Sequence, residues 1–224
     1  MIFKLLKEME ESSHSQRIVS LVKSKITVAE AQTQVPLNED EAVFLLEVWK
    51  ELRSHPRVLE VGLGWGFSAS CLLAAGSVDH TIVSFEPDAQ GTTRESIALH
   101  NVYQFGRPRV IFGPSDRVLP RLLDQGERFG LVLIDGNHLF DFTLVDAFYA
   151  VKLLVVGGFF MLDDTGYPQV QAVCDFIEKN YAHVSLVARP PNAALFQKVS
   201  DRDDRDDCSH FVPFWTLPDD DNTA

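Results

Sequence analysis

The chain has few cysteines and no long hydrophobic run. Its three cysteines, Cys71, Cys174 and Cys208, lie far apart and form no C-x-x-C pair. They therefore indicate buried or incidental thiols in a reducing compartment. The longest apolar runs, such as residues 153–162, are well short of the ~20 residues that a membrane helix needs. Residues 1–10 carry two lysines and two glutamates, unlike a secretory signal, so we expect a cytoplasmic protein that does not bind a membrane.

Basic residues are also scarce. The sequence has 20 Lys and Arg against 32 Asp and Glu, which gives a net charge of −12. Residues 201–224 hold eight aspartates and two arginines, so they carry half of that charge. The remainder is still acidic, and it contains no Lys/Arg cluster that could neutralise phosphates. We therefore exclude RNA and DNA as substrates.

What the chain does have is enough apolar residues for a sizeable core. At 224 residues and 46% hydrophobic, it suits one ordinary domain. We expect a helical extension over residues 1–54, the main domain over 55–199, and an acidic, flexible tail over 200–224. Disorder is typical of the Asp/Arg-rich part of that tail. The aromatic cluster from Phe211 to Trp215 either folds back on the domain or contacts a partner.

Apolar strand segments alternate with helical segments from Arg57 onward. The expected strands are residues 58–61, 81–85, 109–112, 131–134, 158–162, 184–188 and 194–199. The expected helices between them are residues 67–75, 92–100, 116–123, 142–154 and 170–180. Alternation of this kind, with continuously apolar strands, predicts a parallel sheet that helices cover on both faces.

The last two expected strands differ, because only residues 189–193 connect them. A parallel crossover needs about a dozen residues or more, so this connection must be a hairpin. The predicted fold is therefore α/β and Rossmann-like: a seven-stranded, mostly parallel sheet with one antiparallel strand, helices on both faces and an N-terminal helical extension.

That extension contains three expected helices, at residues 2–9, 18–31 and 39–53. The last has the clearest apolar face. Asn38 is a candidate N-cap for it, and Glu41 three residues later completes a capping box. Such helices either cover a cofactor cleft or make a contact in a homo-oligomer, and both roles remain open.

A glycine-rich turn follows the first strand. Glu60 is followed by Gly62, Gly64 and Gly66 in an acidic-x-G-x-G-x-G pattern, whereas a dinucleotide fingerprint reads G-x-G-x-x-G. This segment resembles the first motif of the class I S-adenosylmethionine-dependent methyltransferases, whose sheet also ends in one antiparallel strand. The resemblance implies that the turn holds the amino-acid end of S-adenosylmethionine, with Glu60 acting through water or neighbouring main chain.

Three further residues are candidates for cofactor binding. Glu86 closes the second strand, about 20 residues past the last glycine, where an acid can accept hydrogen bonds from ribose hydroxyls; the alternative is an ordinary loop acid. Ser115 and Asp116 follow the third strand. Their segment is similar to the one that contacts adenine in small-molecule O-methyltransferases, although Ser115 also fits a helix N-cap.

Three aspartates follow two strands of the expected sheet. Asp135 ends the fourth strand, and Asp163 and Asp164 end the fifth. Ligands of open α/β sheets bind beyond the carboxyl ends of the strands, so these acids should converge near the glycine turn. Carboxylates so close together repel one another unless a cation joins them, and oxygen ligands suit Mg²⁺, or Ca²⁺ and Mn²⁺ as substitutes.

The spacing of these acids adds a second resemblance, covering about residues 36–199. Asp135-x-x-His138, followed by two acids from position 163, is similar to the metal-dependent O-methyltransferases of the catechol and macrolide-sugar type. It implies that Asp135, Asp163 and Asp164 hold the metal and that His138 is the catalytic base, with Asp135 also in the catalytic site. The catechol branch has a lysine near that point, and no lysine lies between Asp135 and Lys152 here.

Other interpretations of these residues stay open. Asp135 could instead orient the acceptor, as a polar residue at this position does in metal-free methyltransferases. Asp163 and Asp164 could instead cap a helix that begins near Pro168. His138 also fits a residue that orients Asp135 or hydrogen-bonds the substrate.

The sequence predicts an S-adenosylmethionine-dependent methyltransferase that O-methylates a small-molecule hydroxyl with help from a divalent metal. Alternatives are a metal-independent N- or carboxyl-methyltransferase, an NAD(P)-dependent oxidoreductase, and a non-catalytic Rossmann-like binding protein. The oxidoreductase is disfavoured, because no tyrosine starts a Tyr-x-x-x-Lys pair. A sugar hydroxyl, a phenol and a natural-product alcohol all remain open as acceptors.

Overall fold

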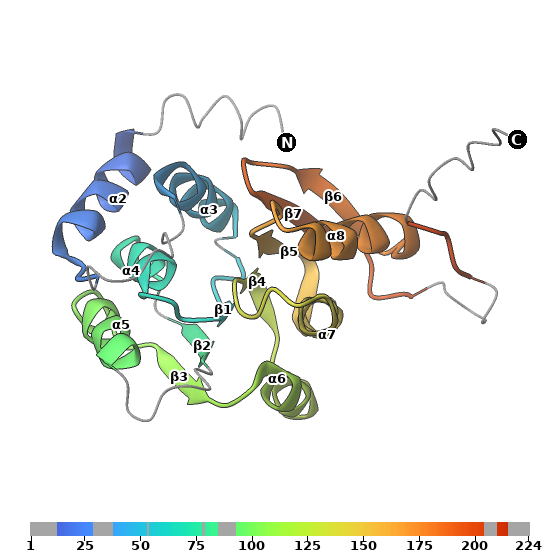
Figure 1. Ribbon diagram of the computed structural model, residues 1–224, viewed down its shortest axis with the longest axis horizontal. Coiled ribbons are helices and arrows are strands. Elements are labelled where there is room, and N and C mark those ends of the chain that lie inside the picture. The colour runs from blue at the N-terminus through green and yellow to red at the C-terminus, as the bar shows by residue number, and fades with distance from the viewer. Residues whose placement is uncertain are drawn as a thin grey trace, which may run out of the picture.

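The computed structural model describes residues 13–28, 38–52, 54–77, 79–84, 93–203 and 210–214 (Figure 1). The helix expected at residues 2–9, the ribose candidate Glu86 and Trp215 of the tail lie outside these ranges. The described part forms one seven-stranded sheet with helices packed around it.

The strands follow the expected positions closely. They are β1 (Val58–Val61), β2 (His80–Ser84), β3 (Arg109–Phe112), β4 (Phe129–Ile134), β5 (Leu154–Asp163), β6 (Val184–Ala188) and β7 (Ala193–Lys198). The helices are α2 (Ser13–Lys25), α3 (Glu39–Glu51), α4 (Phe67–Ala74), α5 (Thr93–Tyr103), α6 (Ser115–Asp124), α7 (Phe140–Leu153) and α8 (Pro168–Asn180).

The strand order is β3-β2-β1-β4-β5-β7-β6. Strands β1 to β5 pair in parallel, whereas β7 runs antiparallel to both β5 and β6. The expected hairpin between the last two strands is therefore confirmed, as is the mostly parallel seven-stranded sheet. The hairpin turn contains Asn192 at φ 60°, a left-handed conformation that asparagine tolerates better than most residues.

Helices cover both faces of the sheet, as Figure 1 shows. On one face, α6, α7 and α8 pack against alternate strand residues such as Leu59, Val132 and Phe160. On the other face, α2, α3 and α4 pack against Val58 and Leu131 and their neighbours. Because consecutive strand residues point to opposite faces, a sheet covered on both sides needs strands that are apolar throughout, which explains the continuous runs in the sequence.

The two described N-terminal helices differ in how well the sequence predicts them. Helix α3 begins after the N-cap Asn38, and the capping box with Glu41 is present. Helix α2 covers Ser13–Lys25, so the expectation of residues 18–31 placed it too late in the chain. Its buried residues Ile18, Val19 and Val22 join the core formed with α3 and α4.

The described part of the tail folds back on α8. The Asn180 side chain bonds the main chain of Val212 twice, accepting from its N–H at 2.8 Å and donating to its carbonyl oxygen at 3.0 Å. The rings of Phe211 and Phe214 pack against Phe176 of α8. Of the two roles left open for the aromatic cluster, packing on the domain is thus confirmed for Phe211–Phe214.

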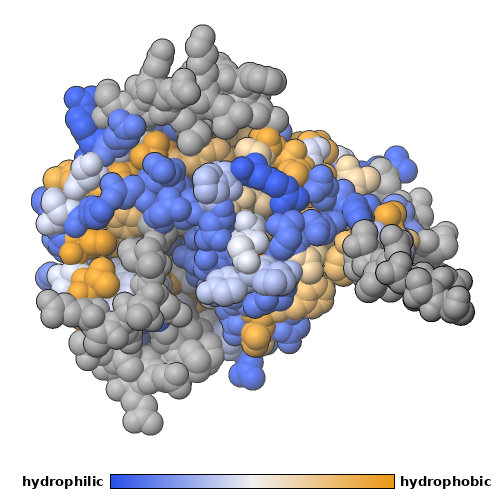
Figure 2. All heavy atoms as spheres, turned by 45° about the horizontal axis from the view of Figure 1, so that its top comes forward, coloured by the Kyte–Doolittle hydropathy of each residue, from blue (hydrophilic) through white to orange (hydrophobic). Residues whose placement is uncertain are grey.

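The surface in Figure 2 mixes hydrophilic areas with smaller hydrophobic ones. Within the described ranges, no helix has both the length and the apolar content that crossing a bilayer requires.

Candidate cofactor and metal site

The glycine turn after β1 lies against the end of β4. A Cβ atom on Gly62 would overlap the carbonyl oxygen of Asp135, so the two main chains touch and only glycine fits. Gly64 differs: it has φ 50°, and the nearest atom to a Cβ added there would be a guanidinium nitrogen of Arg94, at 3.9 Å. Among the described residues, the turn therefore leaves open space at Gly64, whereas it is in close main-chain contact at Gly62.

The last glycine of the motif, Gly66, is the N-cap of α4 and offers no side chain to that helix end. A Cβ there would lie 2.6 Å from Val102 Cγ2 and 2.9 Å from the Ala98 carbonyl oxygen of α5. Gly66 thus allows close packing of two helices. The free N–H groups at the start of α4 suit a carboxylate ligand.

Glu60 lies inside the protein below this turn. Its side chain is 1% exposed and lies 3.0 Å from Nε2 of His80, which is also fully buried. The Ser68 hydroxyl of α4 donates to the other carboxylate oxygen. Both oxygens of Glu60 are therefore used within the chain, linking β1 to β2 and α4. Sequence reasoning assigned no role to His80 and did not consider Ser68, because their contact with Glu60 arises only from the fold.

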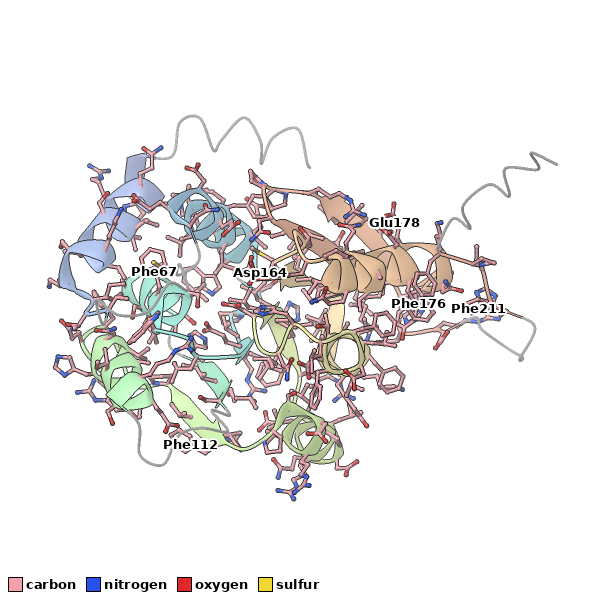
Figure 3. All side chains as sticks on the ribbon, in the orientation of Figure 1. Phe67, Phe112, Asp164, Phe176, Glu178 and Phe211 are labelled. Carbon is pink, nitrogen blue, oxygen red and sulfur yellow. The ribbon has the colours of Figure 1, made fainter. Side chains whose placement is uncertain are left out.

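Asp135, His138 and Asp164 meet beyond the ends of β4 and β5. Figure 3 labels Asp164, the residue that follows β5. His138 Nε2 lies 2.9 Å from Asp164 Oδ2 and 3.7 Å from Asp135 Oδ1. One ligand atom from each of the three residues lies within 4.8 Å of the others. Asp164 has φ 58° and accepts a hydrogen bond from Asn192 Nδ2 at 2.9 Å, so the β6–β7 turn helps to hold the cluster.

Asp163, the other acid expected at this edge, ends β5 and is buried. Its Oδ1 has no hydrogen-bond partner within the described residues, and it is not one of the three clustered residues. The N-cap of α8 is Tyr167, without a side-chain cap. The alternative that Asp163 and Asp164 cap this helix is therefore wrong.

Charge and burial shift the pKa values of these groups. The contacts with Asp135 and then Asp164 raise the pKa of His138 to about 10. His138 in turn lowers the pKa of Asp164. Burial, with a further contribution from the charge of Asp135, raises the pKa of Asp163 to about 8. Burial raises the pKa of Asp135, whereas the nearby His138 opposes that rise. Without a cation, the positive charge of the His138 ring is therefore what favours ionised acids in the cluster.

Ser115 and Asp116 open α6 on the other side of the sheet edge. The N-cap of α6 is Pro114, and Ser115 is already helical, so its alternative role as an N-cap is wrong. The extended φ and ψ of Pro114, −64° and 139°, place the helix boundary one residue earlier. The structure also reveals buried Asp146 of α7, whose pKa burial raises to about 7 and the nearby Ser115 side chain partly lowers.

Three exposed apolar side chains, which we call the rim, lie next to His138 in the fold or in the sequence. Tyr167 stacks on the His138 ring with centroids 5.3 Å apart. Tyr167, Leu139 and Phe140 are exposed large side chains, and they lie beside His138 in the chain or in space. The rim therefore offers a surface for the flat or apolar part of an organic molecule.

Comparisons with known proteins agree with this geometry. Residues 59–165 match a family model described as a methyltransferase domain. A protein of Mycobacteroides abscessus, whose name marks it as a candidate O-methyltransferase, is 34% identical over 94 residues. This match spans 41% of the chain and 42% of the relative's length.

Solved structures share the fold at lower identity. The O-methyltransferase TomG of Streptomyces achromogenes, solved with S-adenosylmethionine, has 18% identity and a TM-score of 0.58 over 84% of this chain and 91% of its own. MycE of the mycinamycin pathway, solved with Mg, S-adenosylhomocysteine and mycinamycin VI, has 16% identity and a TM-score of 0.53. That likeness covers 90% of this chain and 57% of MycE. By sequence, this chain is therefore similar to a methyltransferase domain over just under half of its length and to a candidate O-methyltransferase over a shorter stretch.

Proposed function

We propose that this protein transfers a methyl group from S-adenosylmethionine to a hydroxyl of a small organic molecule, with the help of a divalent cation. The contact between Gly62 and the Asp135 carbonyl carries the proposal. It puts the turn that would hold the methyl donor directly beside the cluster of Asp135, His138 and Asp164.

On the donor side, the open space at Gly64 and the uncapped start of α4 suit the amino-acid end of S-adenosylmethionine. Glu60 would support this turn from below through Ser68 rather than bind the cofactor directly. Glu86 would bind the ribose, and Ser115 and Asp116 would lie against the adenine, as expected from the sequence.

On the acceptor side, Asp135, Asp163 and Asp164 would hold Mg²⁺. The fit rests on their oxygen donors, on the nearness of Asp135 and Asp164, which share the cluster with His138, and on the Oδ1 of buried Asp163, which has no partner within the described residues. When bound, a divalent cation lowers the pKa of a coordinated hydroxyl and fixes its direction of approach.

His138 would be the general base, accepting the hydroxyl proton at Nε2. A base must be neutral to accept a proton. The pKa of about 10 for His138 arises from Asp135 and Asp164, and a cation bound to these acids would offset their charge and lower that pKa. Tyr167 stacks on the ring and would keep it oriented toward the acceptor.

The acceptor class follows from the rim and the relatives. Exposed Leu139, Phe140 and Tyr167 suit an acceptor that pairs its hydroxyl with an apolar or ring-shaped part. The names of TomG and MycE place both in natural-product pathways. A phenol, a sugar hydroxyl on an apolar aglycone and a natural-product alcohol therefore form the panel to test.

The test measures binding and transfer together. Calorimetric titration of S-adenosylhomocysteine establishes whether the chain binds the cofactor, and Glu86→Ala should weaken that binding. Methyl transfer from labelled S-adenosylmethionine to the acceptor panel is then measured with Mg²⁺ or EDTA. Transfer that persists in EDTA would favour the metal-independent alternative, and failure to bind the cofactor would leave a non-catalytic protein.

A further inference from the structure

A further buried acid, Glu41, lies in the first turn of α3, on the side of the N-terminal helices. Its side chain is buried, and the residue is 2% exposed. One carboxylate oxygen, Oε2, accepts from the Asn38 main-chain N–H at 3.0 Å in the capping box. The other oxygen, Oε1, is buried without a hydrogen-bond partner within the described residues. The capping box therefore accounts for Oε2 of Glu41 but not for Oε1.

The packing of α3 and the neighbouring charges place Glu41 near the proposed cation site. Helix α3 shares a core cluster with Ala193, which pairs with Asp163 between β5 and β7. Asp164 and Asp135 are the two acids whose charges act on Glu41, and Glu41 acts in turn on Asp163. Burial and these charges raise the pKa of Glu41. Glu41 and Asp163 thus add two buried carboxyl groups near the cluster of Asp135, His138 and Asp164.

Two of those carboxylates have an oxygen that nothing satisfies. Glu41 Oε1 and Asp163 Oδ1 are both buried and unpartnered within the described ranges. A buried acceptor without a donor destabilises a protein, and several like charges close together do so as well. A divalent cation with its water ligands would supply both the compensating charge and the missing donors.

We propose that Glu41 is a further binding residue of the cation site, contributed by α3 and acting through Oε1 on the ion or on one of its water ligands. This inference rests on the proposed metal-assisted function. It also links the N-terminal helices to the site, because α3 packs on the sheet through the core around Phe44 and Leu45.

The experiment is a titration of the full chain with Mn²⁺, followed by electron paramagnetic resonance of the free ion. Glu41→Gln removes the charge but keeps an oxygen that can accept from Asn38, since glutamine also completes a capping box. Glu39→Gln is the matched control, because Glu39 is exposed in the same first helical turn and pairs with Lys23. Asp135→Asn reports on the cation site itself.

We expect Glu41→Gln to weaken Mn²⁺ binding about tenfold or more, Glu39→Gln to leave it nearly unchanged, and both to melt near the wild-type temperature. Equal Mn²⁺ affinity in Glu41→Gln and Glu39→Gln, with a loss in Asp135→Asn, would overturn this inference alone. Weaker binding of S-adenosylhomocysteine without any change in Mn²⁺ affinity would also overturn it, and would make Glu41 a cofactor residue. A wild-type chain that does not bind Mn²⁺ would overturn the metal assignment as a whole.

Discussion

His80 Nε2 and the Glu60 carboxylate lie 3.0 Å apart in the interior, and neither side chain is accessible to solvent. Glu60 belongs to β1 and His80 opens β2, so the pair joins the two strands below the glycine turn. Ser68 bonds the same carboxylate from α4. The pair therefore ties together the three elements that shape the turn.

Replacing His80 should destabilise the protein strongly. His80→Leu leaves the buried Glu60 carboxylate without one of its partners, which should lower the free energy of unfolding by about 3 kcal/mol. Urea denaturation measures the loss. A double-mutant cycle with Glu60→Gln serves as the control, and additive effects of the two substitutions would show that the pair contributes nothing specific.

Gly62 should tolerate no side chain. In Gly62→Ala, the new Cβ would overlap the Asp135 carbonyl oxygen, so we expect lower stability and loss of S-adenosylhomocysteine binding. Gly126→Ala is the matched control, because Gly126 also has a positive φ of 74° but no atom within 4 Å of a Cβ. That variant should lose only about 1 kcal/mol. Equal losses in the two variants would contradict the close main-chain contact.

Asp146 should make the protein less stable as the pH rises. Its folded pKa of about 7 lies above the ordinary value of ~3.9, so the folded state retains a proton that the unfolded state has lost. The contribution of Asp146 to the free energy of unfolding should therefore fall between pH ~4 and pH ~7 and then level off. Asp146→Asn should remove this share of the slope and be about 4 kcal/mol more stable than wild type at pH 8.

The check on Asp146 is urea denaturation between pH 4.5 and 8.5. Asp124→Asn, at an exposed position of α6, should follow the wild-type pH dependence. An Asp146→Asn curve parallel to that of the wild type would contradict a buried acid that holds its proton.

His138 should act on turnover and not on binding of the donor. Once the panel yields an acceptor, His138→Gln should lower kcat by about 100-fold or more and leave the affinity for S-adenosylhomocysteine unchanged. His100→Gln, at an exposed position of α5, is the control. A His138→Gln variant with wild-type kcat would show that the His138 ring only packs against Tyr167 and does not transfer a proton.

The sequence predicts the sheet well because both of its faces are covered, so each strand forms a continuous apolar run. It predicts β5 too short, at residues 158–162, because Gly157 interrupts the apolar pattern and Leu154 is assigned to the preceding helix, whereas the strand runs from Leu154 to Asp163. The apolar runs also show where the strands end. The sequence therefore predicts that the residues after β4 and β5 lie close together, and Asp135, His138 and Asp164 do meet.

Other parts of the site depend on contacts between distant elements, which spacing does not reveal. Glu41 is visible in the sequence only as part of a helix cap, because its nearness to the acids depends on how α3 packs on the sheet. His80 gives no signal either, since its partner Glu60 lies 20 residues earlier in the chain. Asp146 is one polar residue in an amphipathic helix until α6 is placed over it.

The main-chain contact between Gly62 and Asp135 has a consequence for how enzymes of this design diversify. It sets the spacing between donor turn and acid cluster through the backbone, which no exchange of side chains at the rim alters. Under the proposed function, residues such as Leu139 and Tyr167 could therefore vary to suit new acceptors, while the distance over which the methyl group is transferred stays constant. Substitutions at the rim would then change the acceptor, whereas substitutions at the main-chain contact would abolish methyl transfer.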